Sequence, residues 1–191
     1  MNPTLQRDLN LVDSNPFTYL LSLLDTSFTI TNHEKIMSST VALFVDYENI
    51  PDVRWASNWI DFAQSKGCLI IQNAYTKHWQ NSPADGSLLK RLGFRLVNVI
   101  LNIKNSVDCK CMFDCMEVAK RKRSPDIFIF VTGDGDYAEI INFLKRNHKK
   151  TIVFARRGSE SKRLMGIADE FHFVDDLSKN FSKPKPKLMV K

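Results

Sequence analysis

The chain has 191 residues, of which 43% are hydrophobic and 25% charged, as is typical of one soluble globular domain with short tails. No run reaches the roughly 18 apolar residues that a membrane-spanning helix needs, and no secretory signal is recognisable, so we expect a cytoplasmic protein without membrane association. The net charge is +6, which fits a polyanionic partner such as nucleic acid and equally well a solvated basic surface. The basic clusters are KRKR at 120–123, KRNHKK at 145–150, RR at 156–157, KR at 162–163 and KPKPK at 183–187.

From residue 40 onward, patterns typical of buried strands alternate with patterns typical of helices. Strands are predicted at 40–46, 68–76, 94–101, 126–133, 150–157 and 171–176. Helices are predicted at 54–67, 82–93, 106–123, 136–148 and 159–170, the third of them capped by Ser106. Repeated β–α–β units predict a mainly parallel sheet with helices on both faces, the three-layer α/β/α sandwich of Rossmann-like folds.

The two ends of the chain fall outside this alternation. Residues 1–39 match no unit of the sheet and are predicted to be a poorly defined extension. Because Met37 opens a sequence that looks like an ordinary protein start, residues 1–36 are either absent from the natural protein or a loose appendage. Residues 177–191 are predicted to be a basic Pro/Lys-rich tail without fixed structure.

The cysteines are better explained as packing residues than as a metal site. Cys109, Cys111 and Cys115 lie together within one helical pattern, and Cys68 lies alone. A zinc site needs about four ligands at loop-like spacing, so buried thiols are favoured.

Acidic residues follow the predicted strands at positions that should converge. Asp46 ends the first strand, Asp134 and Asp136 follow the fourth, and Asp108 opens the helix after the third. Ligands of α/β sheets bind at the carboxyl ends of the strands, so these four acids meet if the first and fourth strands are neighbours. Four carboxylates with no basic residue between them repel, and a divalent cation, Mg²⁺ or Mn²⁺ for oxygen ligands, offsets that repulsion. Taken singly, Asp108 and Asp136 are equally well explained as helix caps.

These acids lie in motifs that resemble those of NYN domains, the LabA-like group of PIN-like ribonucleases. The resemblance covers about residues 40–176, with the motifs in family order and at family spacing. The motifs are LFVDYEN at 43–49, SVD at 106–108 with Asp114 six residues later, VTGDGDY at 131–137 and SKRLMGIADEF at 161–171. The resemblance implies a PIN-like fold with adjacent first and fourth strands, a metal site built from acids, and endoribonuclease chemistry on RNA.

Carried over by position, the resemblance assigns roles to individual residues. Asp46, Asp108, Asp134 and Asp136 would hold the metal, and Asn49 would orient the site or contact the substrate. Three further positions match the family motifs: Asp114, Thr132 and Ser161. Asp114 lies well around the helix from Asp108, and the Thr132 hydroxyl is placed to bond an acid. Ser161 is equally well explained as a surface residue.

The implied reaction is hydrolysis of RNA, preferably single-stranded, by water activated on one or two Mg²⁺ or Mn²⁺ ions, which leaves 5′-phosphate and 3′-hydroxyl ends. Tyr47, Trp55 and Trp79 are candidate stacking surfaces for bases, whereas Trp59 is assigned to the core. Many relatives carry a further RNA-binding domain, so specificity is expected here from the RNA's shape, a homodimer or a protein partner. The candidate RNA-contacting residues are Tyr47, Lys104, Arg156, Arg157, Lys162 and Arg163.

Three other functions stay open at this stage. The same cleft would serve a non-catalytic RNA-binding or regulatory module. A phosphatase of another doubly wound class also uses Asp-x-Asp after a strand, but the first strand here ends in D-Y-E. Nucleotide binding is disfavoured because neither G-x-x-x-x-G-K-[ST] nor G-x-G-x-x-G is present.

Overall fold

The computed structural model describes residues 39–100 and 103–181. Apart from Ser39, the predicted N-terminal extension 1–39 lies outside the described residues, and so does the 182–191 part of the predicted tail. The helices and strands that follow are those of these described residues.

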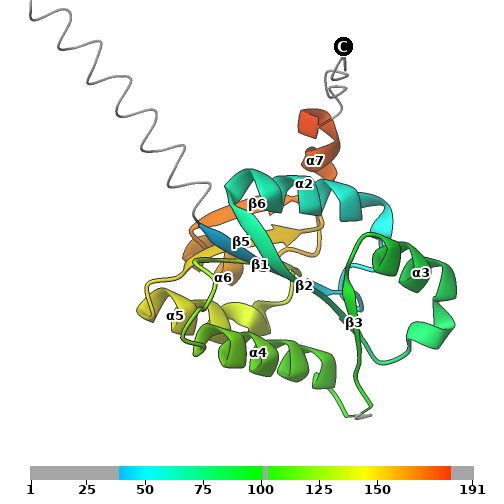
Figure 1. Ribbon diagram of the computed structural model, residues 1–191, viewed down its shortest axis with the longest axis horizontal. Helices are drawn as coiled ribbons and strands as arrows, with labels where there is room; N and C mark the ends of the chain where they lie inside the picture. The colour runs from blue at the N-terminus through cyan, green and yellow to red at the C-terminus, as the bar shows by residue number, and fades with distance from the viewer. Residues whose placement is uncertain (1–38, 101–102, 182–191) are drawn as a thin grey trace, which may run out of the picture. The chain divides into compact units, whose positions relative to one another are not determined.

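Six strands form one all-parallel sheet in the order β3-β2-β1-β4-β5-β6, which confirms the predicted α/β sandwich (Figure 1). The first strand pairs directly with the fourth, so the strand order reverses between them. The third strand is shorter than predicted because the apolar run continues beyond its pairing with β2. The strands are β1 Thr40–Asp46, β2 Cys68–Thr76, β3 Arg95–Asn98, β4 Ile127–Val131, β5 Lys150–Ala155 and β6 Glu170–Phe173.

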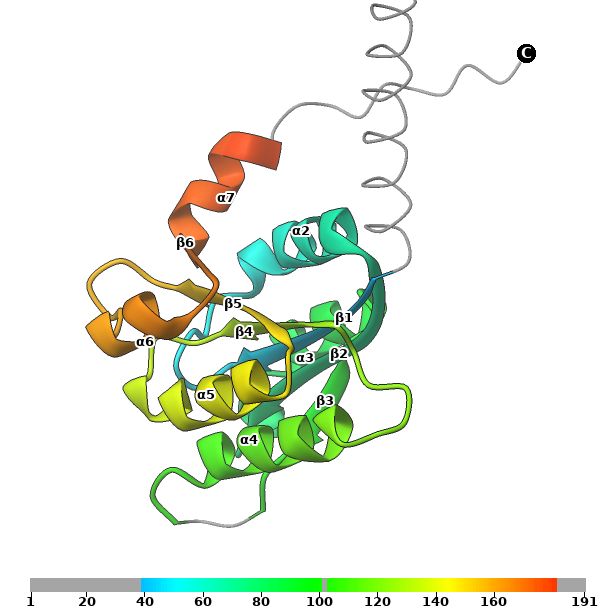
Figure 2. The same ribbon diagram turned by 90° about the vertical axis from the view of Figure 1, so that its left-hand side faces the viewer.

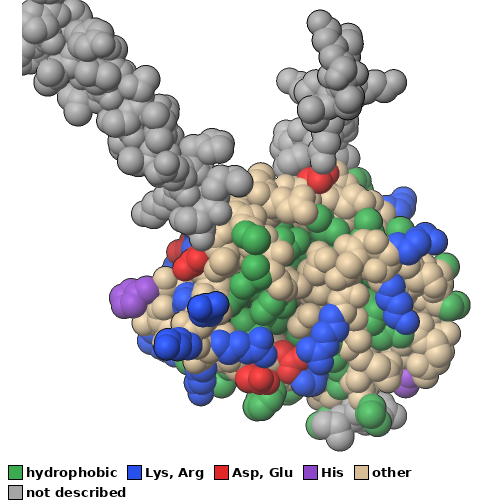
Figure 3. Space-filling view, in the orientation of Figure 1, with side chains coloured by type: hydrophobic (Ala, Val, Ile, Leu, Met, Phe, Trp, Pro, Cys, Tyr) green, Lys and Arg blue, Asp and Glu red, His purple; other side chains and the backbone are tan. Residues whose placement is uncertain are grey.

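Helices cover both faces of this sheet (Figure 2). One face carries α2 Ala56–Lys66, α3 Pro83–Arg91 and α7 Val174–Phe181, and the other carries α4 Ser106–Ala119, α5 Ala138–Arg146 and α6 Lys162–Ile167. Short 3₁₀ turns precede three of them: η1 Val53–Trp55, η2 Trp79–Asn81 and η3 Gly135–Tyr137. The outer faces of α4 and α5 carry many Lys and Arg side chains (Figure 3). Among the helices of the described ranges, none is long and apolar enough to cross a membrane.

The C-terminal end of the fold differs from the prediction. Residues 174–176 were predicted as strand and 177–181 as tail, but both belong to α7. Val174 and Leu177 are buried at helical spacing and pack in the same core as α2, whereas the polar residues between them hide that pattern in the sequence. Helix α4, predicted over 106–123, ends at Ala119, before its predicted basic end at 120–123.

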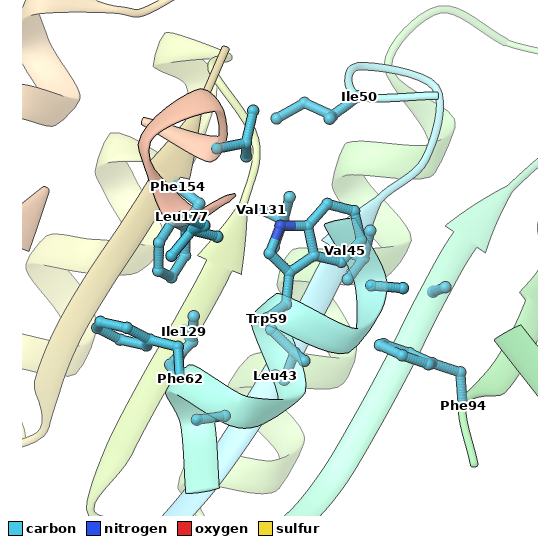
Figure 4. Packing of buried hydrophobic residues seen from close by; sticks show 14 of the residues in the cluster. Leu43, Val45, Ile50, Trp59, Phe62, Phe94, Ile129, Val131, Phe154 and Leu177 are labelled. Atoms are coloured by element: carbon cyan, nitrogen blue, oxygen red, sulfur yellow. The ribbon is translucent and has the colours of Figure 1, made fainter. Parts of the chain in front are cut away.

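The core forms two layers, one on each face of β1. Leu43 and Val45 point toward the α2 side, where Trp59 is fully buried as predicted (Figure 4). Ala42 and Phe44 point toward α4 and α5. Every residue from 41 to 46 is buried, because helices cover both faces of the central strand. This fixes Asp46, the last residue of β1, at the end of a rigid and dry strand.

Candidate functional site

A pocket of about 210 Å³ lies at the carboxyl ends of β1 and β4, where the strand order reverses. Three of the four predicted acids and the predicted Asn49 line it. We call it the acidic pocket; its lining residues are Asp46, Glu48, Asn49, Lys77, Asn105, Ser106, Val107, Asp108 and Asp134. The convergence expected from the strand order is therefore present in the structure.

Asp46 is the buried centre of this pocket, with only 3% of its surface exposed. One carboxylate oxygen accepts the Asn49 N–H at 3.2 Å, and the other lies 3.3 Å from the Thr132 hydroxyl and 3.4 Å from the Tyr137 hydroxyl. Burial, and after it the negative charge of Asp108, raises the pKa of Asp46 from 3.8 to about 7. Without a bound cation, this carboxyl group is therefore largely protonated below neutral pH.

Asp108 lies on the first turn of α4 and faces the same pocket. Its negative charge favours the protonated form of Asp46 and so helps to raise the pKa of that buried carboxyl group. Partial burial is the main cause that raises the pKa of Asp108, and the charges of Asp134 and Asp136 raise it further. Asp108 is therefore the acid that interacts electrostatically with the other three predicted acids.

The loop after β4 is held against the loop after β1 by the side chain of Asn49. Asn49 accepts the Gly133 N–H through its side-chain oxygen at 2.7 Å. A Cβ atom on Gly133 would lie 2.3 Å from the Ser159 carbonyl oxygen, so no larger residue fits. The role of Asn49 seen here is to join the two loops that carry the acids.

The two aspartates of VTGDGDY play different parts. Asp134 lines the pocket and also caps η3, because its side chain accepts the Asp136 N–H at 2.9 Å. Asp136 is exposed and does not line the pocket; it accepts a hydrogen bond from the Asn105 amide at 2.9 Å. The helix-capping explanation considered for Asp136 therefore applies to Asp134, and Asp136 instead links the β4 loop to the start of α4.

The start of α4 differs from the prediction in an informative way. The capping position is Asn105, which has a left-handed backbone with φ of 56°, and not Ser106. The Ser106 hydroxyl is buried in the pocket wall and has no hydrogen-bond partner among the described residues. A buried polar atom without a partner is costly, so this hydroxyl points to a group that enters the pocket.

Sequence reasoning missed four polar lining residues: Glu48, Lys77, Asn105 and Ser106. The expectation that no basic residue lies among the acids was wrong, because Lys77 lines the pocket at the end of β2. The rule that ligands gather at the carboxyl ends of strands would have found it, since β2 is the neighbour of β1. Glu48 accepts hydrogen bonds from the Thr76 hydroxyl and the Lys77 N–H, which ties the two strand ends together.

Of the three further family positions, Thr132 and Ser161 are neighbours of the pocket and Asp114 lies outside it. Thr132 contacts Asp46 directly, as described above. Ser161 donates its N–H to the Gly133 carbonyl, and its hydroxyl would lie 2.9 Å from a Cβ on Gly135, so it supports the β4 loop. Asp114 lies outside the pocket, 8% exposed, and accepts hydrogen bonds from Tyr75 and Lys110.

None of the six candidate RNA-contacting residues lines the acidic pocket. Tyr47 is only 8% exposed; its ring packs 4.8 Å from that of Trp79 and its hydroxyl donates to Asp85, so it offers no free face to a base. Arg157 pairs with Asp176 and Arg163 pairs with Glu139, both at 2.5 Å. The remaining three, Lys104, Arg156 and Lys162, are exposed.

The cysteines follow the prediction only in part. Cys111 and Cys115 lie on the inner side of α4 and are fully buried, as expected for packing thiols. Cys68 and Cys109 are exposed, because they lie at the start of β2 and on the outer side of α4.

The pocket's chemistry fits a divalent cation, although no group of three or more His, Cys, Asp or Glu side chains in the described ranges is arranged to hold one as it stands. The donors are carboxylate, amide and hydroxyl oxygens, which Mg²⁺ and Mn²⁺ prefer. The mutual repulsion of Asp46 and Asp108 and the unpartnered Ser106 hydroxyl are features that a bound cation and its ligands would satisfy.

The fold and this pocket define a PIN-like, nuclease-type α/β domain, and comparison with known proteins agrees. The family model of the NYN domain matches residues 40–176. The chain therefore belongs to the NYN domain family. A solved structure of a protein of unknown function from Vibrio parahaemolyticus is similar in fold, with 22% identity, a TM-score of 0.62, and coverage of 73% of this chain and 94% of that one. No curated protein matches the chain.

Proposed function

We propose that this protein is a divalent-metal-dependent endoribonuclease that hydrolyses phosphodiester bonds of single-stranded RNA in the acidic pocket. The observation that carries the proposal is the convergence of Asp46, Asp108 and Asp134 on one pocket at the carboxyl ends of β1 and β4. Membership of the NYN family supports the nuclease class, and the oxygen-rich lining supports Mg²⁺ or Mn²⁺ as the cofactor.

The chain's own residues prepare the pocket for this reaction. Asp46, Asp108 and Asp134 would hold the cation, which when bound supplies a water of lowered pKa and offsets charge on the phosphate. Asp46 must give up the proton that its burial favours, so binding of the cation and loss of this proton are coupled. Asp108, the less buried of the pair, is placed to orient a water molecule.

Two further residues would act on the substrate. Lys77 brings a positive charge to the pocket wall, where it would attract the scissile phosphate. Asn49 is fixed through its side-chain oxygen by the Gly133 N–H, which leaves its amide nitrogen as a donor toward the pocket that it lines. Asp136 would act at a distance by holding Asn105 beside Asp108.

A cleavage assay with matched carboxylate variants tests this function. A 5′-labelled 20-nucleotide RNA without secondary structure is incubated with Mn²⁺, Mg²⁺ or EDTA, using wild type, Asp134→Asn and Glu139→Gln. Glu139 is an exposed carboxylate on α5 outside the pocket, so its variant is the control for loss of one negative charge. We expect metal-dependent cleavage, with 5′-phosphate products, by wild type and Glu139→Gln only.

The other outcomes identify the alternatives. Equal cleavage by Asp134→Asn and wild type would mean a contaminating nuclease and would remove the support for this pocket. Tight RNA binding without any cleavage under all metal conditions would favour the non-catalytic RNA-binding module.

A further inference from the structure

Two basic clusters of this protein, at 120–123 and 145–150, lie at the end of the sheet opposite to the acidic pocket, whereas those at 156–157 and 162–163 follow β5 at its carboxyl end. The loop after α4 and the turn after α5 both lie at the amino ends of the strands, since Asp126 donates its N–H to Thr40 at the start of β1 and accepts that of Lys150 at the start of β5. The two helices pack side by side. Their ends form what we call the amino-edge basic cluster: Lys120, Arg121, Lys122, Arg123, Lys145, Arg146 and Lys149.

Among the residues that the structure describes, most of this charge has no ion-pair partner. Arg121 pairs with Glu117 at 3.3 Å, and Lys145 pairs with Asp169 at 3.1 Å, but both pairs are exposed and therefore weak. Figure 3 shows Lys and Arg side chains over the ends of α4 and α5, with few acids among them. Favourable interaction with the helix dipole accounts for a cation or two in a last turn. It does not account for Lys122 and Arg123, which lie beyond the end of α4.

Helix α4 connects the acidic pocket and the amino-edge basic cluster. Its first turn carries Asp108 in the acidic pocket, and its last residue adjoins the amino-edge basic cluster. From Asp108 to Arg121 the chain advances 13 positions, which at 1.5 Å per helical residue is roughly 20 Å.

A hollow along α4 lies between the two regions. It has a volume of about 520 Å³ and lies between α4 and the first halves of β2 and β3. Arg95, Lys110 and Arg121 line it, and Arg121 also belongs to the amino-edge basic cluster. Asp114 and Glu117 also line it and pair with Lys110 and Arg121. Its three basic and two acidic side chains therefore give the hollow a net charge of +1, and the buried Asn73 adds hydrogen-bonding groups.

We propose that the RNA strand cut in the acidic pocket runs along α4 and that its flank is held by the hollow and the amino-edge basic cluster. This inference rests on the proposed function. The carboxylates of the acidic pocket outnumber Lys77, the basic residue in its lining, so most of the binding free energy must come from outside the pocket. Each phosphate neutralised by Lys or Arg there releases counterions. At a rise of 3.4 Å per stacked nucleotide, the separation of 20 Å corresponds to about six nucleotides between the cut and the held flank.

Two matched double variants test the binding surface. Lys122→Gln/Arg123→Gln removes two charges from the amino-edge basic cluster, and Lys90→Gln/Arg91→Gln removes two exposed charges from the end of α3, on the other face of the sheet. Binding of a labelled 20-nucleotide RNA is measured by fluorescence anisotropy in EDTA, across a salt series. We expect roughly tenfold weaker binding at low salt and a salt slope smaller by about 1.4 for the first variant only.

Cleavage by the same variants separates binding from chemistry. With Mn²⁺ and the 20-nucleotide RNA, the first variant should show a raised KM and an unchanged kcat. With a 5-nucleotide RNA, which is too short to reach the cluster, both variants should behave as wild type. Equal losses in both variants, no loss in either, or a loss of kcat would overturn the inference.

The result also separates this inference from the proposed function and from a membrane role. If wild type cuts no RNA, the proposed function fails, whatever the binding series shows. If wild type cuts RNA but the two double variants bind it equally, only the inference fails. Binding of the cluster to phosphatidylserine–phosphatidylcholine vesicles, with no difference between variants on RNA, would point to a lipid surface and overturn it as well.

Discussion

The acidic pocket and the amino-edge basic cluster differ both in the sign of their charge and in how firmly their side chains are held. At the carboxyl ends, Asp46 is 3% exposed and each of its oxygens has neighbours, and the loops around it interlock through Asn49 and Gly133. At the amino ends, Lys122 and Arg123 are exposed in a loop beyond the end of α4. Chemistry needs groups fixed in place, whereas sequence-independent attraction of a polyanion needs only charge within reach.

The strongest way to break this comparison is to neutralise one acid on each side of it, on the same helix. Asp108→Asn removes a carboxylate from the acidic pocket, and Asp114→Asn removes one that lies in the hollow. We expect Asp108→Asn to lower the rate of RNA cleavage roughly 10³-fold, since a bound metal contributes several kcal/mol. Asp114→Asn should stay within about tenfold of wild type, as measured by initial rates with Mn²⁺. Similar losses in both would show that position relative to the pocket does not matter.

The interlocked loops can be tested with two glycines. Gly133→Ala places a Cβ 2.3 Å from the Ser159 carbonyl oxygen, so the β4 loop must shift; we expect a loss of about 1–3 kcal/mol in the free energy of unfolding and roughly 10²-fold in cleavage. Gly166, within α6, has nothing within 4 Å of its Cβ position, and Gly166→Ala should stabilise by about 0.5–1 kcal/mol. Urea denaturation measures the stability of both variants, and an unchanged Gly133→Ala would show that the loop after β4 does not pack against Ser159 as described.

The raised pKa of Asp46 predicts how the metal-free protein responds to pH. The folded state holds this proton up to a pH of about 7, whereas the unfolded chain releases it near 3.8. The contribution to stability is therefore complete below pH 4 and is lost as the pH rises toward 7 and above. In EDTA, the urea midpoint of wild type should fall from pH 5 to pH 8 by more than that of Asp46→Asn. An equal fall in both proteins would assign the dependence to other groups.

The same coupling predicts how metal acts. Mn²⁺ competes with the proton on Asp46, so added Mn²⁺ should raise the thermal midpoint of wild type more at pH 8 than at pH 6. A shift that is the same at both pH values would mean that the metal binds away from Asp46.

The smallest predicted effect concerns the hydroxyl of Ser106. This hydroxyl has no partner among the described residues, so Ser106→Ala should change the free energy of unfolding by less than about 1 kcal/mol. If the hydroxyl serves a group that enters the pocket, cleavage should still fall, by roughly tenfold. Thermal unfolding and initial rates measured on one preparation give both numbers. A clearly destabilised variant would instead assign Ser106 a structural role.

The sequence was sufficient for the parts of the site that depend on topology. Continuous apolar runs placed the first two strands at their observed bounds, and the position of Asp46 at the end of β1 and of Asp134 after β4 followed from them. Because the carboxyl ends of adjacent parallel strands meet at one edge, the meeting of these acids could be predicted from strand order alone.

The remaining parts depend on contacts between segments far apart in the chain. The approach of Ser159 to Gly133 and the bond from Asn105 to Asp136 arise only when the loops pack. Helix α7 was missed because two buried apolar residues in a polar segment give too weak a helical pattern.

Whether RNA is cut in the acidic pocket is tested by the single-turnover cleavage rate of Asp46→Asn, measured with Mn²⁺ at saturating 20-nucleotide RNA. Asparagine resembles the protonated carboxyl group that this burial favours, so the variant should stay folded and should bind the RNA at least as tightly as wild type. The account predicts a cleavage rate at least roughly 10²-fold below that of wild type. A rate equal to that of wild type, with the same products, would contradict the assignment of the acidic pocket as the site of cleavage.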